Sequence, residues 1–517
     1  MKALEILSKL QLKAELLANI YCVTVNSDDI AKIATALVNE YDLPLSLMFV
    51  TDERAEKKCY TVHAVFSLDE SHERLELRAE VSASHPHYPS ITATIMAAHW
   101  YERYSHDMFG VVPDGHPDLR RLVNHENIPN ATHPLRKDFI WNKKLEHANE
   151  PYPMGHVKGE GIFEIPVGPI HAGIIEPGHF RFNVAGERII TLEGKLFFTH
   201  KGVEKLLEGK TPVEGLKFIE RLSGDMAAAN ALAYCQAVEI LANVNVPELA
   251  LILRTLVAEL ERLTMHVHDI ANIGGMGTGF SFIAANGFRV KERLMRLSEE
   301  VLGNRFWRGL ILPGGVSKSF TTSELARIKL VVNEAFAEIK EITTTALSSE
   351  GFMDRLQTTG ILPLEAAKAF GALGLPARSS GVDRDVRRDF PHAAYAKFPV
   401  KVVVKTAGDV HARFTARLDE LNETVRLINI LIDQMPTGEY SVNCTPRDGY
   451  AIGATESWRG EVLCAVVIRN GQIERCFPRD PSFCNWATFG IIGPGNIVPD
   501  FPLCNKSLNL SYSGTDM

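Results

Sequence analysis

The residue types best suited to hold a metal are scattered along this sequence. Eight cysteines occur, no two of them form a CxxC pair, and the closest two, Cys476 and Cys484, are eight positions apart. Zinc ribbons and iron–sulfur clusters need thiolates at short loop spacing, because one ion or cluster must contact all of them. The sequence therefore predicts no cysteine-built metal centre, and we expect these cysteines to be small buried apolar residues.

Nucleotide-binding motifs and histidine pairs give no stronger signal. The run Gly275-Met276-Gly277-Thr278-Gly279 is not spaced as GxGxxG and follows a predicted helix, so a dinucleotide fold is not supported. No GxxxxGKS or GxxxxGKT phosphate loop occurs. His266 and His268 are two positions apart, which places them on different faces of a helix and favours solvent or core histidines over a shared metal.

Composition narrows the class of protein. The chain has 517 residues, with 55 Lys and Arg against 63 Asp and Glu, a net charge of −8; 45% of residues are hydrophobic. This length predicts two or more domains, and the acidic balance argues against nucleic acid as the main partner. No stretch approaches the roughly 20 apolar residues of a membrane span. Lys9 and Lys13 interrupt any signal peptide, so we expect a cytoplasmic chain without a transmembrane segment.

Short β-type runs mixed with helical stretches fill the first part of the chain. The runs Leu45–Thr51 and Tyr60–Phe66 indicate strands, and the polar, irregular stretch from Val123 to Gly161 is typical of an extended connector. We predict an α+β fold: an N-terminal α/β sandwich domain over residues 1–140, a connector over 141–163, and a mainly α-helical domain with small antiparallel β elements over 164–517.

After Gly168 helical periodicity is expected to dominate. Apolar residues recur in steps of four and three from Phe414 to Met435, and a second such seam runs from Leu249 to Ile270. An alanine-rich helix is predicted from Asp225 to Ala242. Val462–Ile468, followed by Asn470-Gly471, indicates a β-hairpin.

Several longer motifs resemble subunits of respiratory complex I. Those that match the thirty-kilodalton subunit are Glu102-Arg103, Asp107-Met108-Phe109-Gly110, Gly115-His116-Pro117-Asp118-Leu119-Arg120-Arg121 and His133-Pro134-Leu135-Arg136-Lys137-Asp138. Arg, Lys and Asp interleaved with Gly and Pro are also expected of an exposed loop that contacts another protein. Without the resemblance, a solvated charged loop would be the simplest interpretation.

Downstream motifs resemble the forty-nine-kilodalton subunit and its relative, the large subunit of group 4 nickel–iron hydrogenases. These are Gly168-Pro169-Ile170-His171, Glu176-Pro177-Gly178-His179-Phe180-Arg181-Phe182, His200-Lys201-Gly202-Val203-Glu204-Lys205, Glu259-Leu260-Glu261-Arg262, Ala377–Arg387 and Glu456-Ser457-Trp458-Arg459-Gly460-Glu461. The resemblance covers nearly the whole chain. A single chain with both modules is similar to the large subunit of formate hydrogenlyase and hydrogenase-4 type complexes.

The sequence departs from this family at the implied metal centre. In the family, four thiolates from Arg-x-Cys-Gly-x-Cys and Asp-Pro-Cys-x-x-Cys segments hold nickel and iron, which favour soft sulfur ligands. The corresponding positions here are Ser223, Met226, Ser511 and Gly514. A serine hydroxyl stays protonated near neutral pH, a thioether is a weak neutral donor, and glycine has no side chain. We therefore predict no metal centre.

Complex I uses the equivalent cavity for a quinone, held by a His and a Tyr. Here the Tyr position falls on Pro212 and the His position between Ile175 and Pro177, so that pair is not reproduced. The resemblance implies a polar cavity lined by the four substituted positions together with His171, Glu176, Asp225, Arg378 and Asp385. Such groups can relay protons or bind a polar ligand, or they can be salt-bridged residues that fix the core.

The resemblance implies a peripheral-arm subunit of a membrane-bound, complex I-like oxidoreductase, on the cytoplasmic side, that takes part in electron transfer coupled to ion translocation. An iron–sulfur small subunit and antiporter-like membrane subunits are the expected partners. The chain itself is expected to bind no cofactor, with a quinone as one candidate ligand. The alternatives are a quinone-reducing subunit, a catalytically silent scaffold, and a hydrogenase with unusual metal ligands.

Overall fold

A computed structural model describes residues 2–171 and 175–517 of the chain. Its N-terminal part is a five-stranded sheet in the order β1-β2-β5-β4-β3, in which neighbours are antiparallel except for the parallel pair β2 and β5. The strands are β1 (Glu15–Leu17), β2 (Ile20–Val25), β3 (Leu45–Glu53), β4 (Cys59–Leu68) and β5 (Glu73–Ser82). The strands predicted at residues 45–51 and 60–66 are confirmed as β3 and β4.

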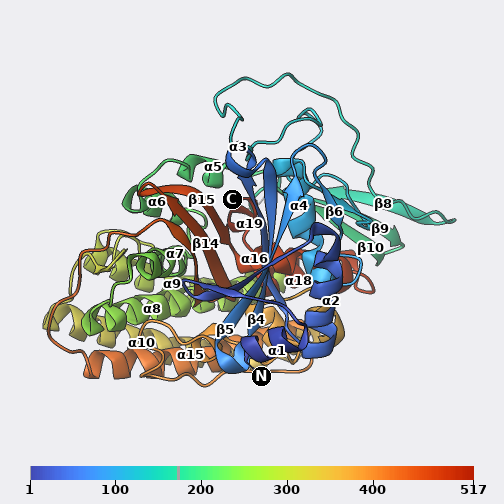
Figure 1. The fold of residues 1–517 in the computed structure, drawn as a ribbon. Coiled ribbons are helices and arrows are strands. Elements are labelled where there is room, and N and C mark those ends of the chain that lie inside the picture. The colour runs from blue at the N-terminus through green and yellow to red at the C-terminus, as the bar shows by residue number, and fades with distance from the viewer. Residues whose placement is uncertain (1, 172–174) are drawn as a thin grey trace.

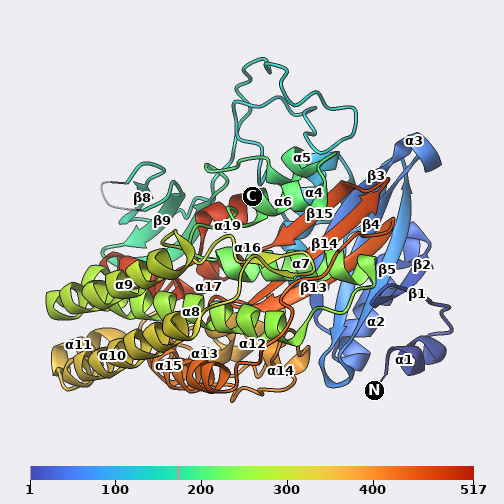
Figure 2. The same ribbon diagram turned by 90° about the vertical axis from the view of Figure 1, so that its left-hand side faces the viewer.

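Nearly every residue of β3 and β4 is buried, which requires cover on both faces of this sheet. Helices cover one side, and a second sheet, β13-β14-β15, lies against the other (Figure 2). Phe49 of β3 packs against Tyr450 of β13 and Phe477 of β15. The remaining elements here are α1 (Ala3–Lys9), α2 (Ile30–Tyr41), α3 (Arg54–Lys57), β6 (His87–Pro89), α4 (His99–Phe109) and β7 (Val112–Asp114).

Residues 115–161 contain no helix or strand and form the long loops at the top of Figure 1. The predicted connector 141–163 lies almost wholly in this stretch, and most of its side chains are exposed. The N-terminal sheet and the C-terminal sheet share one apolar core. The predicted domains 1–140 and 164–517 are therefore in contact, and their boundaries stay a prediction.

The regular structure that follows differs from the expected helices. It is an antiparallel sheet in the order β10-β9-β8, formed by β8 (Ile162–Val167), β9 (His179–Ala185) and β10 (Arg188–Lys195). In β9, Phe180, Phe182 and Val184 are buried at alternate positions, which is the period of a strand. The helical periodicity therefore begins only after this sheet.

Helices dominate from residue 203 onward and stack in layers (Figure 1). The two predicted apolar seams are confirmed as α8 and α15, which pack against each other, and the alanine-rich helix is confirmed as α7. The helices and short strands are α5 (Val203–Leu207), α6 (Pro212–Ile219), α7 (Ala227–Ala242), α8 (Glu248–Asn272), α9 (Ser281–Leu302), β11 (Ile311–Leu312), β12 (Gly315–Val316), α10 (Thr322–Leu347), α11 (Glu350–Leu356), α12 (Leu364–Ala369), α13 (Gly374–Ser379), α14 (Val386–Asp389) and α15 (Val410–Asp433). The glycine-rich run 275–279 begins inside a π-helical turn, Ile273–Gly277, at the end of α8.

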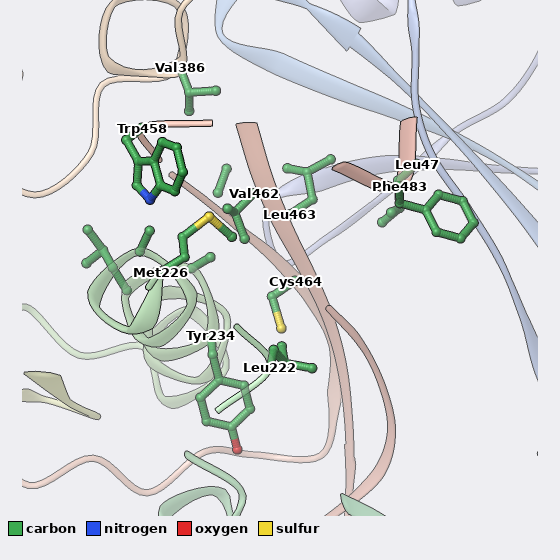
Figure 3. Packing of buried hydrophobic residues seen from close by; sticks show 14 of the residues in the cluster. Leu47, Leu222, Met226, Tyr234, Val386, Trp458, Val462, Leu463, Cys464 and Phe483 are labelled. Atoms are coloured by element: carbon green, nitrogen blue, oxygen red, sulfur yellow. The ribbon is translucent and has the colours of Figure 1, made fainter. Parts of the chain in front are cut away.

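The C-terminal sheet consists of β13 (Gly449–Glu456), β14 (Glu461–Arg469) and β15 (Gln472–Arg479). Asn470 and Gly471 both have positive φ, 52° and 73°, as a two-residue hairpin turn of type I′ requires, so the predicted hairpin is confirmed. Helix α7 lies on this sheet (Figure 3). Its approach at β13 is so close that a Cβ on Gly453 would lie 1.8 Å from the Ala233 carbonyl oxygen.

Short helices end the chain: α16 (Pro481–Asn485), α17 (Phe489–Ile492), α18 (Phe501–Leu508) and α19 (Tyr512–Asp516). They return to the β8–β10 sheet, where Phe501 packs on Phe180 and Phe182. Within the described residues, no helix has both the length and the apolar character to cross a membrane. The combination of separate sheets with a helical body confirms the predicted α+β class.

Candidate functional site

Two of the four substituted ligand positions meet through their hydroxyl groups. Ser223 lies in the turn between α6 and α7, and Ser511 caps the N-terminus of α19 by accepting a hydrogen bond from Gly514 N at 2.9 Å. The Oγ atoms of Ser223 and Ser511 are 3.1 Å apart, and both residues are buried. The structure thus brings segments 288 positions apart into contact at this point.

These hydroxyls form one directed hydrogen-bond chain that ends on Asp225. Ser223 Oγ donates to Asp225 Oδ1, so the hydrogen between the two serines comes from Ser511. Asp225 also accepts two bonds from the Arg459 guanidinium, at 2.9 and 2.7 Å. Burial alone would raise the pKa of Asp225, but Arg459 and the Ser223 hydroxyl outweigh it and hold that pKa below its usual value.

Met226 points into the apolar core. It precedes the first residue of α7, is fully buried, and lies beside Trp458 and Val462 (Figure 3). Its thioether therefore contributes to packing between α7 and the C-terminal sheet.

Gly514, the fourth position, faces a carboxylate. A Cβ on this residue would lie 2.2 Å from Oδ2 of Asp480. Asp480 accepts a hydrogen bond from Ser482 N at 2.7 Å through Oδ1, while Oδ2 is buried without a hydrogen-bond partner among the described residues. Burial raises the pKa of Asp480.

A cavity of about 460 Å³ opens beside this cluster. Its wall includes the predicted site residues Glu176 and Asp225. Glu176 accepts a hydrogen bond from Ser513 N at 3.4 Å, and burial raises its pKa. The other ionisable residues on the wall are His268, Lys291, Arg459, Lys506 and Tyr512.

His171 lies outside this wall. Its Nε2 atom donates a hydrogen bond of 2.9 Å to the Gly178 carbonyl oxygen, which ties the loop after β8 to the start of β9. The imidazole therefore positions the strand that follows Glu176.

Arg378 and Asp385 belong to a separate buried network of charges. Arg378 donates to Glu456 and to Glu420, each at 2.6 Å, and lies 3.6 Å from Asp385. Asp385 is paired with Arg387 at 2.7 Å. These ion pairs tie α13, α14 and α15 to β13, so the two predicted residues fix the core rather than line the cavity.

Comparison with known proteins identifies related families for two segments of the chain. Residues 23–145 match the family of the respiratory-chain NADH dehydrogenase 30 Kd subunit, and residues 277–447 match that of the 49 Kd subunit. Formate hydrogenlyase subunit 5 of Escherichia coli is 32% identical over 509 residues, which cover 96% of this chain and 88% of that protein. The chain belongs to the family that joins the 30 kDa and 49 kDa domains of complex I and includes formate hydrogenlyase subunit 5.

Other relatives agree with that membership. Hydrogenase-4 component G of Escherichia coli is 31% identical over 96% of this chain and 87% of its own length. The fused C/D component of NADH-quinone oxidoreductase from Bdellovibrio bacteriovorus is 27% identical over 88% of this chain and 87% of its own length. In fold, the chain is similar to a chain of the membrane-bound sulfane sulfur reductase, an archaeal respiratory membrane complex, with a TM-score of 0.66 and 24% identity over 71% of this chain and 100% of that one.

The nickel–iron centre that the hydrogenase resemblance implies does not fit these residues. The serine hydroxyls are engaged with each other and with Asp225, Met226 lies in the core, and Asp480 occupies the space beside Gly514. No thiolate is among the four residues, so these positions lack the charged sulfur donors that low-valent nickel and iron favour, and the one thioether, Met226, is turned into the core.

The quinone positions of complex I are also filled differently. Pro212 begins α6, and its carbonyl oxygen accepts a hydrogen bond of 2.8 Å from Tyr234, away from the cavity wall. A histidine and a tyrosine do face the cavity, but they are His268 and Tyr512.

Sequence reasoning missed four of the residues on the cavity wall: His268, Lys291, Lys506 and Tyr512. A partial indication for His268 was present in the sequence, because a residue two positions from His266 lies on another face of the helix. In the structure His266 bonds Glu420 at 2.7 Å in the buried network, while His268 faces the cavity. Nothing in the local pattern of α9 or α18 marks Lys291 or Lys506, since their neighbours across the cavity come from distant segments.

Proposed function

We propose that this chain is a peripheral-arm subunit of a membrane-bound, complex I-like oxidoreductase and takes part in electron transfer coupled to ion translocation without its own nickel–iron centre. Family membership supports the first part of this proposal. The observation that carries the second part is the closed hydrogen-bond chain from Ser511 through Ser223 to Asp225. In this chain, hydroxyl groups at two of the metal-ligand positions bond each other and Asp225, so neither is left free to bind a metal.

In this proposal the electrons come from an iron–sulfur cluster in a partner small subunit. The chain adds no cofactor of its own; it supplies the cavity at Glu176 and Asp225, where a reducible small molecule, such as a quinone, accepts them. Antiporter-like membrane subunits are the proposed route for ions, and the cytoplasmic side of the membrane is the proposed location.

Metal analysis of the purified complex tests the missing centre. We expect iron from the partner's clusters and no stoichiometric nickel, together with no hydrogen uptake. One nickel per chain would contradict the proposal and would favour a hydrogenase with unusual ligands.

A cavity-filling variant tests the role of the cavity. Met276 lies on its wall and is 48% exposed, so Met276→Trp should fill space without disturbing the core. With electrons supplied by a reduced viologen and a soluble quinone as acceptor, we expect lower turnover for this variant. Met96→Trp, at a residue 36% exposed in the N-terminal part, is the matched control. Equal turnover for both variants would favour the silent scaffold.

A further inference from the structure

Two lysines face the cavity without a counter-charge in contact. Lys291 comes from α9 and Lys506 from α18, and both are half-buried. Among the described residues, neither ammonium group has a carboxylate within salt-bridge distance or a hydrogen-bond acceptor. Partial burial of an ammonium group without such partners is unfavourable in free energy, because the charge loses hydration and gains no ion pair or hydrogen bond.

Asp225 and Asp269, the carboxylates with the largest electrostatic effect on these lysines, are already paired. Asp269 of α8 is fully buried and bound by Arg417 at 2.8 Å and by Asn509 Nδ2 at 2.5 Å. Asp225 is bound by Arg459 through two hydrogen bonds. Burial lowers the pKa of Lys291 and that of Lys506, as expected where no close anion offsets the loss of water.

The charges on the cavity wall are unequal. Three cations, Lys291, Lys506 and Arg459, face two carboxylates, Asp225 and Glu176. His268 adds no positive charge near neutral pH, because burial lowers its pKa to about 4. An anion that entered the cavity would therefore meet a net positive wall.

The rest of the wall suits a ligand that is not wholly polar. Ile175, Met276, Phe288 and Leu510 contribute apolar surface. Tyr512 accepts a hydrogen bond from Asn505 at 3.4 Å, which leaves its hydroxyl hydrogen available to a ligand. A volume of about 460 Å³ falls in the usual range for small-molecule sites, roughly 300–1,000 Å³.

We propose that this cavity binds a small organic anion, a carboxylate with an apolar body, whose charge is paired with the ammonium groups of Lys291 and Lys506. The inference names the ligand class for the cavity of the proposed function and rests on that assignment. Inorganic anions lack the apolar part. A neutral ligand such as a quinone would leave both lysines unpaired, so within the proposed function a carboxylate takes the place of the quinone.

Equilibrium dialysis of the full chain with radiolabelled benzoate at low ionic strength tests the proposal. We expect one benzoate bound per chain, competition by other aromatic carboxylates, and no competition by benzamide, which has the same shape without the charge. Lys291→Met and Lys506→Met should each weaken binding by about tenfold or more, the scale of one charge-assisted contact. Lys291→Arg and Lys506→Arg should retain binding.

Lys397→Met is the matched control, because Lys397 is exposed and pairs with Glu248 at 2.6 Å. It should leave benzoate binding unchanged. Equal binding of benzoate and benzamide, equal displacement by sulfate, or full binding in both lysine variants would overturn the proposal. So would loss of the site on assembly with the partner subunits, which would mean that an acidic segment of a partner occupies it.

This measurement is independent of turnover. If benzoate fails to bind while Met276→Trp still lowers turnover, the anion inference is wrong and the proposed function stands. If benzoate binds as expected while Met276→Trp turns over normally, the cavity is an anion site in a subunit whose redox role is disproved.

Discussion

Asp480 occupies the space in which a side chain at residue 514 would begin. A Cβ on Gly514 would lie 2.2 Å from Asp480 Oδ2 and 3.1 Å from Ser511 Oγ, and contacts under 3.0 Å essentially never occur for real Cβ atoms. Asp480 cannot easily move away, because its other oxygen caps α16. Glycine at position 514 is therefore part of the packing of this cluster.

Replacement of Gly514 by alanine should destabilise the protein. The added methyl group must displace the Asp480 carboxylate, and overpacking of this kind costs about 1–3 kcal/mol. Denaturant unfolding measures the change. Gly351→Ala is the control: Gly351 lies in α11 with open space around it, and alanine there should be neutral or stabilising. A Gly514→Ala protein as stable as the wild type would contradict this packing.

Loss of Arg378 should destabilise the fold, independently of any role of the cavity in turnover. Arg378→Met leaves the buried carboxylates of Glu420 and Glu456 without their 2.6 Å partners, at a cost of about 3–5 kcal/mol. Arg296→Met is the comparison: Arg296 is exposed and pairs with the partly exposed Glu292 at 2.9 Å, so its loss should cost less than about 1 kcal/mol. Similar unfolding midpoints for the two variants would contradict the predicted contribution of this buried network to stability.

The free energy of unfolding should depend on pH through Glu261. Its carboxylate accepts hydrogen bonds from Ala228 N and Ala229 N, at 2.8 and 3.1 Å, yet burial raises its pKa from 4.5 to about 8. Between about pH 4.5 and 8 the unfolded chain has lost the Glu261 proton while the folded chain still holds it. The free energy of unfolding therefore falls as pH rises through this range and levels off above about pH 8.

Comparison with Glu261→Gln isolates this effect. The wild type should lose stability relative to the variant by up to about 1.4 kcal/mol per pH unit as pH rises from about 5 to 8. Glu214→Gln should show no such loss, because hydrogen bonds from Thr211 lower the pKa of Glu214. Chemical denaturation at several pH values gives the difference, and a pH-independent gap between wild type and Glu261→Gln would disprove the prediction.

Limited trypsin digestion should cut the connector first. Lys143 and Lys144 are exposed in a stretch without regular structure, which is where proteases act most readily. The two fragments should still elute together in native gel filtration, because Phe49 packs on Phe477 and Arg475 donates to the Val50 carbonyl oxygen at 3.2 Å. They should separate only in denaturant; separation under native conditions would mean that the shared core is weak.

Local patterns predicted much of the fold. The strands β3 and β4, the helices α7, α8 and α15, and the β14–β15 hairpin all follow from apolar periods and a turn dipeptide, which depend on neighbouring residues. The β8–β10 sheet was missed, because the alternation of Phe180, Phe182 and Val184 is short and lies among loop residues.

The sequence by itself determined the family, because its motifs are read from residue types at fixed spacings. On the same basis it predicted that Ser223 and Ser511 stand at metal-ligand positions. Only the tertiary structure decided where the ionisable groups act. In the tertiary structure Arg378 is paired with Glu420 and Glu456, and Lys291 and Lys506 lie on one cavity wall. The physical reason is that the partners of a buried charge are set by packing between segments far apart in the chain, which no local pattern encodes.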